Sequence, residues 1–226
     1  VVGVVDAHKS SAAGTATLDI FGGACTELQK DCDGSSANGC ETDLRSDPAH
    51  CGACDSPCPS GALCEAGACK DDPATTFSAG RSGSCVVVES GRAFCWGRNY
   101  YGALGDGTST DSSFPVEVLG IDDAVEVAAG YEHACARLEG GEIRCWGYNA
   151  QGQVGDGTNT NRTSPVTVFG IDDATDVEAG VHGKTTYVIG SDGKILAFGQ
   201  GDNGEIGEGL LVNRFRPAEV SLAGPA

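Results

Sequence analysis

The sequence of 226 residues contains no methionine, only two tryptophans and no long apolar segment. A membrane-spanning helix needs roughly 20 apolar residues, and the run from Val1 to Val5 is much shorter. The sequence therefore predicts no transmembrane segment. Because no initiator methionine is present, we expect a processed or partial chain, and removal of a signal peptide is the simplest explanation.

Basic residues are also scarce in this chain. Lys and Arg number 14 against 32 Asp and Glu, which gives a formal net charge of -18 at pH 7. Binding to nucleic acid or to an anionic membrane relies on a cationic surface. The charge therefore argues against both classes of partner, and a protein partner is favoured.

Cysteine, in contrast, is abundant, with 12 residues in spacings that partly repeat. A reducing cytosol keeps such pairs open, whereas secreted proteins hold them as disulfides. We therefore expect a secreted protein or one located at the extracellular surface.

The composition changes near residue 75 and divides the chain into four parts. Residues 1–24 contain two strand-like runs, 25–70 are rich in cysteine, 71–76 form a polar linker, and 77–226 contain repeats. The β-prone amino-terminal part fits an edge strand of its own domain, a strand donated to another chain, or an unstructured tail.

The cysteine-rich part has too few large apolar residues to build a core, so covalent or metal crosslinks must hold it together. Its even number of cysteines favours four disulfides, whose connectivity the sequence does not determine. These residues are Cys25, Cys32, Cys40, Cys51, Cys54, Cys58, Cys64 and Cys69.

Zinc and haem are the alternatives for these cysteines. A tetrathiolate zinc site would use Cys51, Cys54, Cys64 and Cys69, but four further cysteines would then lack partners. Haem attachment through C-x-x-C-H is excluded, because Asp55 follows Cys54 where histidine is required.

Calcium is a weak candidate in the same part, since carboxylates on a glycine-rich loop suit this ion. The register of an EF-hand is absent, and a solvated acidic loop is the preferred interpretation. Apart from this candidate, the sequence predicts no metal and no cofactor. The four acidic residues are Asp31, Asp33, Glu41 and Asp43.

Three related segments follow, at 77–127, 128–177 and 178–222. The first two share a run from tryptophan through Gly-Asp-Gly-Thr, fifty residues apart, while the third has Phe198 and Glu208 in place of tryptophan and aspartate. A period of this length marks a repeat architecture. Each segment is therefore expected to be one structural module.

The second segment shows how such a module folds. Residues 125–128, 133–138, 143–146 and 163–168 alternate as strands do, with a tight turn at 139–142. Four antiparallel strands in about fifty residues are typical of a propeller blade. The predicted fold class is all-β, a partial β-propeller of three four-stranded blades preceded by a disulfide-rich, loop-rich module.

Cys85 and Cys95 flank the hairpin of the first segment, and Cys135 and Cys145 flank that of the second. The third segment has Tyr187 and Ala197 at these positions, so both cysteines are lost together. Joint loss indicates pairing, and we predict two disulfides within the blades.

Two resemblances support this division. Asp31-Cys32-Asp33-Gly34 and Asn38-Gly39-Cys40-Glu41-Thr42 resemble a short cysteine-rich module of secreted bacterial surface proteins, which implies a location outside the cell. Residues 96–108 and 146–158 resemble the repeat of the regulator of chromosome condensation family, and 198–209 are similar. Such families usually form seven-bladed propellers, so further blades, other chains or the cysteine-rich module would cover the edges of three blades.

Members of that family act as exchange factors, light sensors, inhibitors or extracellular scaffolds, and the fold alone does not choose among them. No histidine recurs beside a nucleophile, and His133 and His182 are interpreted as exposed loop residues near one repeat position, whose first-segment equivalent is Gly83. The recurring acids Asp106, Asp156 and Glu208 are interpreted as turn caps rather than a ring of acids.

We therefore expect a non-catalytic extracellular structural or interaction protein, part of a surface or fibre-like assembly or an adhesin. Its blades would bind proteins, through self-association or with further blades that close the propeller. The alternative is a soluble propeller that binds a ligand or inhibits an enzyme. Catalytic and cofactor-binding residues are not predicted.

Overall fold

A computed structural model describes residues 29–30, 42–43, 63–65 and 68–222, which form strands, turns and loops. No helix long and apolar enough to cross a membrane occurs among these residues. The chain divides into two compact units, Val1–Asp72 and Pro73–Ala226. The division falls inside the linker predicted at 71–76.

The first unit contains two small antiparallel sheets. Strand β1 (Gln29–Lys30) pairs with β2 (Thr42–Asp43), and β3 (Leu63–Glu65) pairs with β4 (Ala68–Lys70). Both cysteines of the second sheet, Cys64 and Cys69, are disulfide-bonded. This contradicts the zinc alternative, because a thiolate ligand cannot also form a disulfide. The segment 1–24 and the remaining six cysteines of this unit lie outside the described residues.

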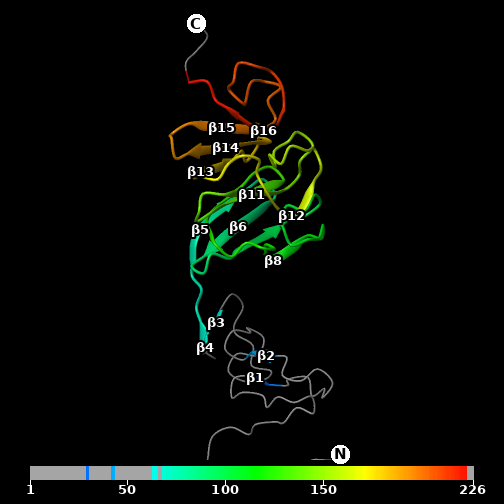
Figure 1. Cartoon of the computed structure of the whole chain (residues 1–226). Helices are drawn as coiled ribbons and strands as arrows, with labels where there is room; N and C mark the ends of the chain where they lie inside the picture. The colour runs from blue at the N-terminus through cyan, green and yellow to red at the C-terminus, as the bar shows by residue number, and fades with distance from the viewer. Residues whose placement is uncertain (1–28, 31–41, 44–62, 66–67, 223–226) are drawn as a thin grey trace, which may run out of the picture. The chain divides into compact units, whose positions relative to one another are not determined.

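The second unit contains three sheets of four antiparallel strands, each in sequence order from one edge to the other. We call them blades 1, 2 and 3, and Figure 1 shows them in succession along the chain. Blade 1 has β5 (Ala74–Ala79), β6 (Gly83–Val88), β7 (Ala93–Gly97) and β8 (Ser112–Glu117). Blade 2 has β9 (Ala124–Ala129), β10 (His133–Leu138), β11 (Ile143–Gly147) and β12 (Arg162–Thr167). Blade 3 has β13 (Ala174–Ala179), β14 (Thr185–Gly190), β15 (Ile195–Gly199) and β16 (Arg214–Glu219).

The strands of the second repeat lie within one residue of their predicted ends at most positions, because alternation in a half-buried strand is a strong signal. Two strands extend across predicted boundaries. Residues 74–76 belong to β5 rather than to the linker, since Ala74 pairs with Val88 and Thr76 with Val87. Strand β9 crosses the repeat boundary predicted at 127/128, because its backbone pairs with β10 of the same blade.

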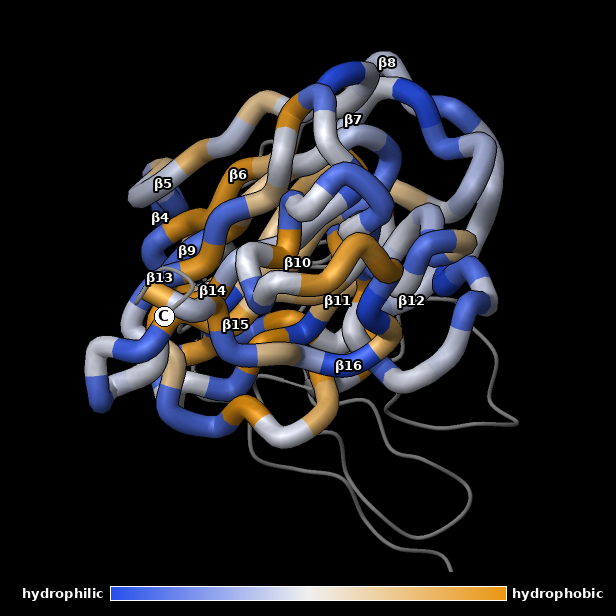
Figure 2. Tube along the Cα trace, turned by 90° about the horizontal axis from the view of Figure 1, so that it is seen from above, coloured by the Kyte–Doolittle hydropathy of each residue, from blue (hydrophilic) through white to orange (hydrophobic). Residues whose placement is uncertain are grey.

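Each blade has a leading face toward the blade before it and a trailing face toward the blade after it. One buried cluster joins the trailing face of blade 1, including Val87, with the leading face of blade 2, including Val127. A second cluster joins blade 2 with blade 3 through Ile143 and Val177 in the same way. Figure 2 shows hydrophobic segments on β6, β9, β10 and β14, surrounded by mostly hydrophilic loops. The core therefore lies between the blades.

Candidate functional site

The long loop between the third and fourth strands is held by a buried asparagine in blades 1 and 2. In blade 2, Asn149 accepts a hydrogen bond from the Val154 backbone N–H at 3.0 Å and donates to the carbonyls of Thr158 and Thr160. Asn99 makes the equivalent bonds in blade 1. One side chain thus satisfies several backbone groups of an irregular loop, which would otherwise be costly to bury.

The recurring acids of these loops cap turns in blades 1 and 2, as predicted. The Asp106 carboxylate accepts from the backbone N–H of Thr108 at 3.0 Å, and Asp156 does the same with Thr158 at 2.9 Å. Partial burial acts to raise the pKa of Asp156, but the bonds from Thr158 and the charge of Arg162 outweigh it and leave this pKa below its usual value. Both carboxylates bind turns of their own loops, and Asp156 also binds the Arg162 guanidinium at the start of β12.

The third acid keeps an ion pair like the one that Asp156 makes with Arg162 but lacks the bond to the turn. Glu208 binds the Arg214 guanidinium through two bonds, with Nη2 to Oε2 at 2.7 Å. Its longer side chain reaches the strand β16 rather than the turn that follows it. The predicted capping role therefore does not describe Glu208, whose carboxylate forms a bidentate ion pair instead.

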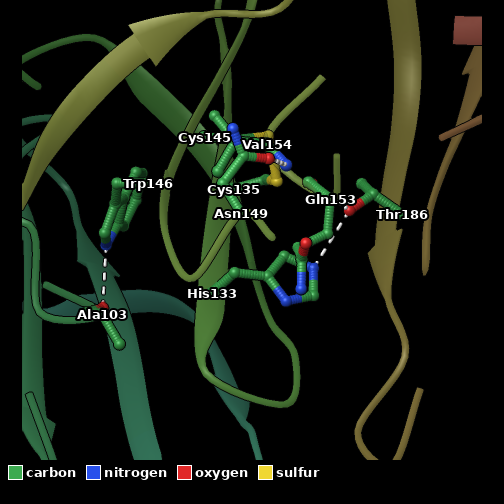
Figure 3. The surroundings of a disulfide bond; sticks show 9 residues. All are labelled: Ala103, His133, Cys135, Cys145, Trp146, Asn149, Gln153, Val154 and Thr186. Atoms are coloured by element: carbon green, nitrogen blue, oxygen red, sulfur yellow. Dashed lines mark hydrogen bonds between the residues drawn. A yellow bond between two sulfur atoms is a disulfide. The ribbon is translucent and has the colours of Figure 1, made fainter. Parts of the chain in front are cut away.

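An aromatic ring on the leading face of each following blade packs against the Gly-Asp-Gly loop of the blade before it. Trp146 is fully buried, and its indole N–H donates to the Ala103 carbonyl at 2.9 Å (Figure 3). A Cβ added at Gly105 would lie 2.9 Å from the Trp146 ring, and at Gly155 one would lie 2.6 Å from the Phe198 ring. Glycine is required there because the ring occupies the space of a side chain.

One backbone carbonyl of this loop accepts a hydrogen bond from a different side chain in each blade. It belongs to Ala103 in blade 1, Gln153 in blade 2 and Glu205 in blade 3. Phe198 has no N–H, and the Gln153 carbonyl accepts instead from the Thr186 hydroxyl at 2.9 Å. In blade 3 the Glu205 carbonyl accepts from the Tyr187 hydroxyl at 2.7 Å. The same backbone group is therefore satisfied three times by unrelated side chains.

Both disulfides predicted in the blades are present, Cys85–Cys95 and Cys135–Cys145. Each joins residues directly opposite in neighbouring strands, with Cα atoms 4.1 and 4.0 Å apart. They lie on trailing faces and belong to the clusters under the next blade. No cysteine is free in the described part of the chain. The disulfides are structural, since burial separates them from a substrate.

His133 is the one histidine buried in the blades that the structure describes, and its exposed fraction is 2%. Its Nε2 lies 3.0 Å from the Thr186 hydroxyl oxygen (Figure 3). Because that hydroxyl donates to Gln153, Nε2 must carry the proton that His133 donates. Nδ1 has no hydrogen-bond partner among the described residues. Burial lowers the pKa of His133 to about 4, so the ring is neutral at pH 7.

The interpretation of His133 and His182 as equivalent loop residues was wrong for His133. His133 pairs with Gly147, Gly83 with Gly97, and Thr185 with Gly199, so the three residues hold the same position in their blades. The equivalence of His133 with Gly83 was predicted, but the equivalent in blade 3 is Thr185 and not His182. Two extra residues in blade 3 displaced the sequence alignment. His182 is exposed in the loop before β14. His8 and His50 lie outside the described residues.

The calcium candidates remain predictions. Asp31, Asp33 and Glu41 lie outside the described residues, and Asp43 is placed only as part of the backbone of β2. In the described ranges, no group of three His, Cys, Asp or Glu side chains is arranged to hold a metal ion.

The leading face of blade 1 carries an apolar row that the sequence did not single out. Phe77 lies opposite Val86, and Val86 lies opposite Phe94, with Trp96 two residues further along β7. The equivalent residues of blades 2 and 3 are mostly buried against the preceding blade. Phe77, in contrast, has an exposed fraction of 76%. Phe77 therefore departs from the burial pattern of the other two blades, while Val86 and Phe94 are half-buried.

Comparison with known families identifies the repeat. A model described as "Regulator of chromosome condensation (RCC1) repeat" matches residues 90–137 and 141–183, and a second model with this description matches 74–103 and 124–153. Residues 74–137 and 141–183 therefore match RCC1 repeats, in agreement with the resemblance. No curated protein sequence matches the chain.

Solved structures of related architecture confirm the fold. Prp20p from Saccharomyces cerevisiae, studied for its binding to Gsp1p and histones, has a TM-score of 0.59 and 18% identity over 66% of this chain and 39% of that protein. Human WBSCR16 has a TM-score of 0.59 and 19% identity over 77% of this chain and 46% of that protein. Yeast RCC1 (Prp20) with Kap60 bound has a TM-score of 0.58 and 16% identity, over 66% and 37% of the two chains. This chain thus spans less than half the length of these relatives.

Proposed function

We propose that this chain, a carrier of RCC1 repeats, is a non-catalytic protein-interaction scaffold in an extracellular surface or fibre-like assembly. The blades supply a rigid framework, and proteins of this architecture include Prp20p, which was studied for its binding to Gsp1p and histones. The recurring polar residues of the described loops serve the loops themselves. What the blades offer to another molecule is therefore surface rather than reactive groups.

The observation that carries the proposal is the exposed leading face of blade 1. Phe77, Val86 and Phe94 form a cross-strand row, and the Arg92 guanidinium lies 5.2 Å from the centre of the Phe94 ring. Exposed apolar surface of this kind marks protein contact sites. The same face of blades 2 and 3 is covered by protein.

The proposed occupant is the trailing face of blade 3 in a second copy of the chain. Its cavity of about 190 Å³ is lined by Tyr187, Ile189 and Ile195 together with the carboxylates of Asp176 and Glu178. Neither carboxylate forms an ion pair within the described residues. The apolar rings of the leading face complement the apolar lining of this cavity, and Arg92, which pairs with Glu117 in its own blade, adds positive charge beside them.

The extracellular location is supported by cysteine usage. The chain has 12 cysteines, and those that the structure describes are all disulfide-bonded. Such bonds persist in oxidising compartments. Outside the cell, where chaperones do not protect the chain, disulfides within the blades would increase its stability.

Light scattering of the wild-type chain and of Phe77→Asp tests the proposal. We expect the wild type to exceed the mass of one chain as concentration rises, and Phe77→Asp to weaken association by about tenfold or more, because a buried phenylalanine contributes about 2 kcal/mol. Phe114→Asp is the matched control, since Phe114 is 77% exposed but lies on the outer strand β8. A wild-type chain that stays monomeric would contradict the assembly and favour the soluble binding or inhibitory propeller.

A further inference from the structure

Four of the five tyrosines in the chain gather where the loops of the three blades meet. The Tyr100 and Tyr101 rings are 4.7 Å apart edge to face, and the Tyr101 and Tyr148 rings are 4.6 Å apart. Tyr131 joins them through Lys184, whose ammonium lies 5.1 Å from the Tyr131 ring and 5.3 Å from the Tyr148 ring. We call this group, with Arg81, the tyrosine surface.

The tyrosine surface spans all three blades at one end of the strands. Arg81 follows β5, Tyr131 follows β9, and Lys184 precedes β14, so each comes from the loop between the first two strands of its blade. The Arg81 guanidinium lies 4.4 Å from the centre of the Tyr131 ring, so this ring contacts a cation from the blade before it and one from the blade after it. The group therefore rests on a framework that the blade contacts hold fixed.

The loops do not need these tyrosines to fold. In blade 2 the positions of Tyr100 and Tyr101 hold Ala150 and Gln151, and the loop keeps the same asparagine bonds. Tyr100 is 67% exposed. Large aromatic side chains that remain exposed without a packing role are residues available for binding.

The two cations of the tyrosine surface are unusual in so acidic a chain. Acidic residues outnumber basic ones by 32 to 14, yet neither Arg81 nor Lys184 forms an ion pair with any described residue. At the rim, Arg98 lies 3.7 Å from Glu132 and is largely exposed. Cations that face rings instead of carboxylates keep their charge available for an anionic partner.

We propose that the tyrosine surface binds an acidic segment of a partner protein. Carboxylates of that segment pair with Arg81 and Lys184, and its apolar side chains contact the Tyr100 and Tyr101 rings. Tyrosine and arginine are the side chains that contribute most at protein interfaces. A nucleic acid is disfavoured because it is a long polyanion. The parts of it that extend beyond the tyrosine surface would be repelled by a chain with a net charge of -18. This inference goes beyond the proposed assembly, because it uses the loops and not the blade faces.

Binding of a short fluorescently labelled peptide of glutamate and tyrosine, followed by fluorescence anisotropy, tests the proposal, because a short segment stays within the tyrosine surface and avoids the acidic remainder of the chain. We expect the wild-type chain to bind it, with an affinity that falls as salt is added. Arg81→Ala combined with Lys184→Ala should weaken binding about tenfold or more, and Tyr100→Ala about fivefold. Equal thermal midpoints of variants and wild type would show that the blades remain folded.

Lys194→Ala is the control for loss of positive charge elsewhere, since Lys194 lies in the turn between β14 and β15 at the other end of the strands. This control removes one positive charge, whereas the double variant removes two. Its binding should equal that of the wild type. No binding of the acidic peptide by the wild type, or an equal loss in Lys194→Ala, would overturn the proposal. Equally tight binding of polygalacturonate, lost in the same variants, would assign the surface to a polysaccharide instead. Self-association lost in the Arg81 and Lys184 variant, but kept in Phe77→Asp, would assign it to a second copy.

Discussion

His133 connects blade 2 to blade 3 through a hydrogen bond to Thr186, and its burial favours the neutral form of the ring. Its Nε2 donates to Thr186, and Nδ1 has no acceptor among the described residues. Protonation would add a charge and a second N–H in a place that burial has separated from water. The low pKa of about 4 follows from this burial.

The pH dependence of stability is the prediction for this residue. The folded pKa of His133 is about 4 against an ordinary value of 6.5, so between these values the unfolded chain binds a proton that the folded chain does not. Stability therefore falls as pH falls through this window, by about 2 kcal/mol between pH 7 and pH 5. Urea unfolding followed by tryptophan fluorescence at the two pH values measures it, since both tryptophans lie in the blades.

The control separates His133 from the other titrating groups. His182→Gln should keep the full pH dependence because His182 is exposed, whereas His133→Gln should lose most of it even if its stability at pH 7 is lower. An unchanged loss of stability in His133→Gln would show that carboxylates, and not this histidine, are responsible.

At the scale of the elements, each disulfide of blades 1 and 2 lies beneath the next blade. Cys135 and Cys145 are fully buried with Ile143 and Val188 in the second cluster. Blade 3 keeps four strands with Tyr187 and Ala197 at the same positions. The blade fold therefore does not require the bond, and the bond contributes stability to a fold that the strands already define.

Replacing the pair by Cys135→Ala and Cys145→Ala should leave the chain folded but less stable by about 3 kcal/mol, from the loop entropy of a bridge spanning ten residues. Urea unfolding without reductant measures the difference. A reducing agent should lower the wild type further than this variant, because the variant has one bond fewer to lose. Complete unfolding of the double variant in water would contradict the view that the strands alone define the blade.

The strands could be predicted because alternation and turns are local signals. His133–Leu138 has the predicted bounds, and the position of Cys135 and Cys145 on either side of a short hairpin was enough to predict their pairing. Blade 3 was harder, since Gly201 replaces the anchoring asparagine and two residues are added before β14. The sequence still retained enough glycine and apolar spacing to predict a third blade and to align Tyr187 and Ala197 with the cysteine pairs, but not to align His182 correctly.

The surfaces could not be predicted in the same way. Phe77 is one apolar residue in a strand, and only the burial of Val127 and Val177 in equivalent positions shows that its exposure is exceptional. The tyrosine surface joins residues from loops that are distant in sequence, such as Tyr101 and Tyr148. No periodicity connects them, so their proximity follows from the stacking of blades and not from any local pattern.

At the scale of the whole molecule, the blades act as repeats that bury their faces against one another. A repeat protein of this kind is stabilised mainly by contacts between neighbouring units. The apolar row on blade 1 extends the same mode of contact to another chain. Assembly would then reuse the interface that already occurs twice within the described residues.

Photo-crosslinking from position 77 tests this account most directly. Phe77 is replaced by the photoreactive p-benzoylphenylalanine, and Phe114, equally exposed on β8, is replaced in a control chain. After irradiation at a concentration where the wild type associates, we expect a covalent dimer from position 77, with the crosslink mapped to residues 174–199 of the second chain. No adduct from position 77, or the same yield and sites from position 114, would contradict the proposed use of this face.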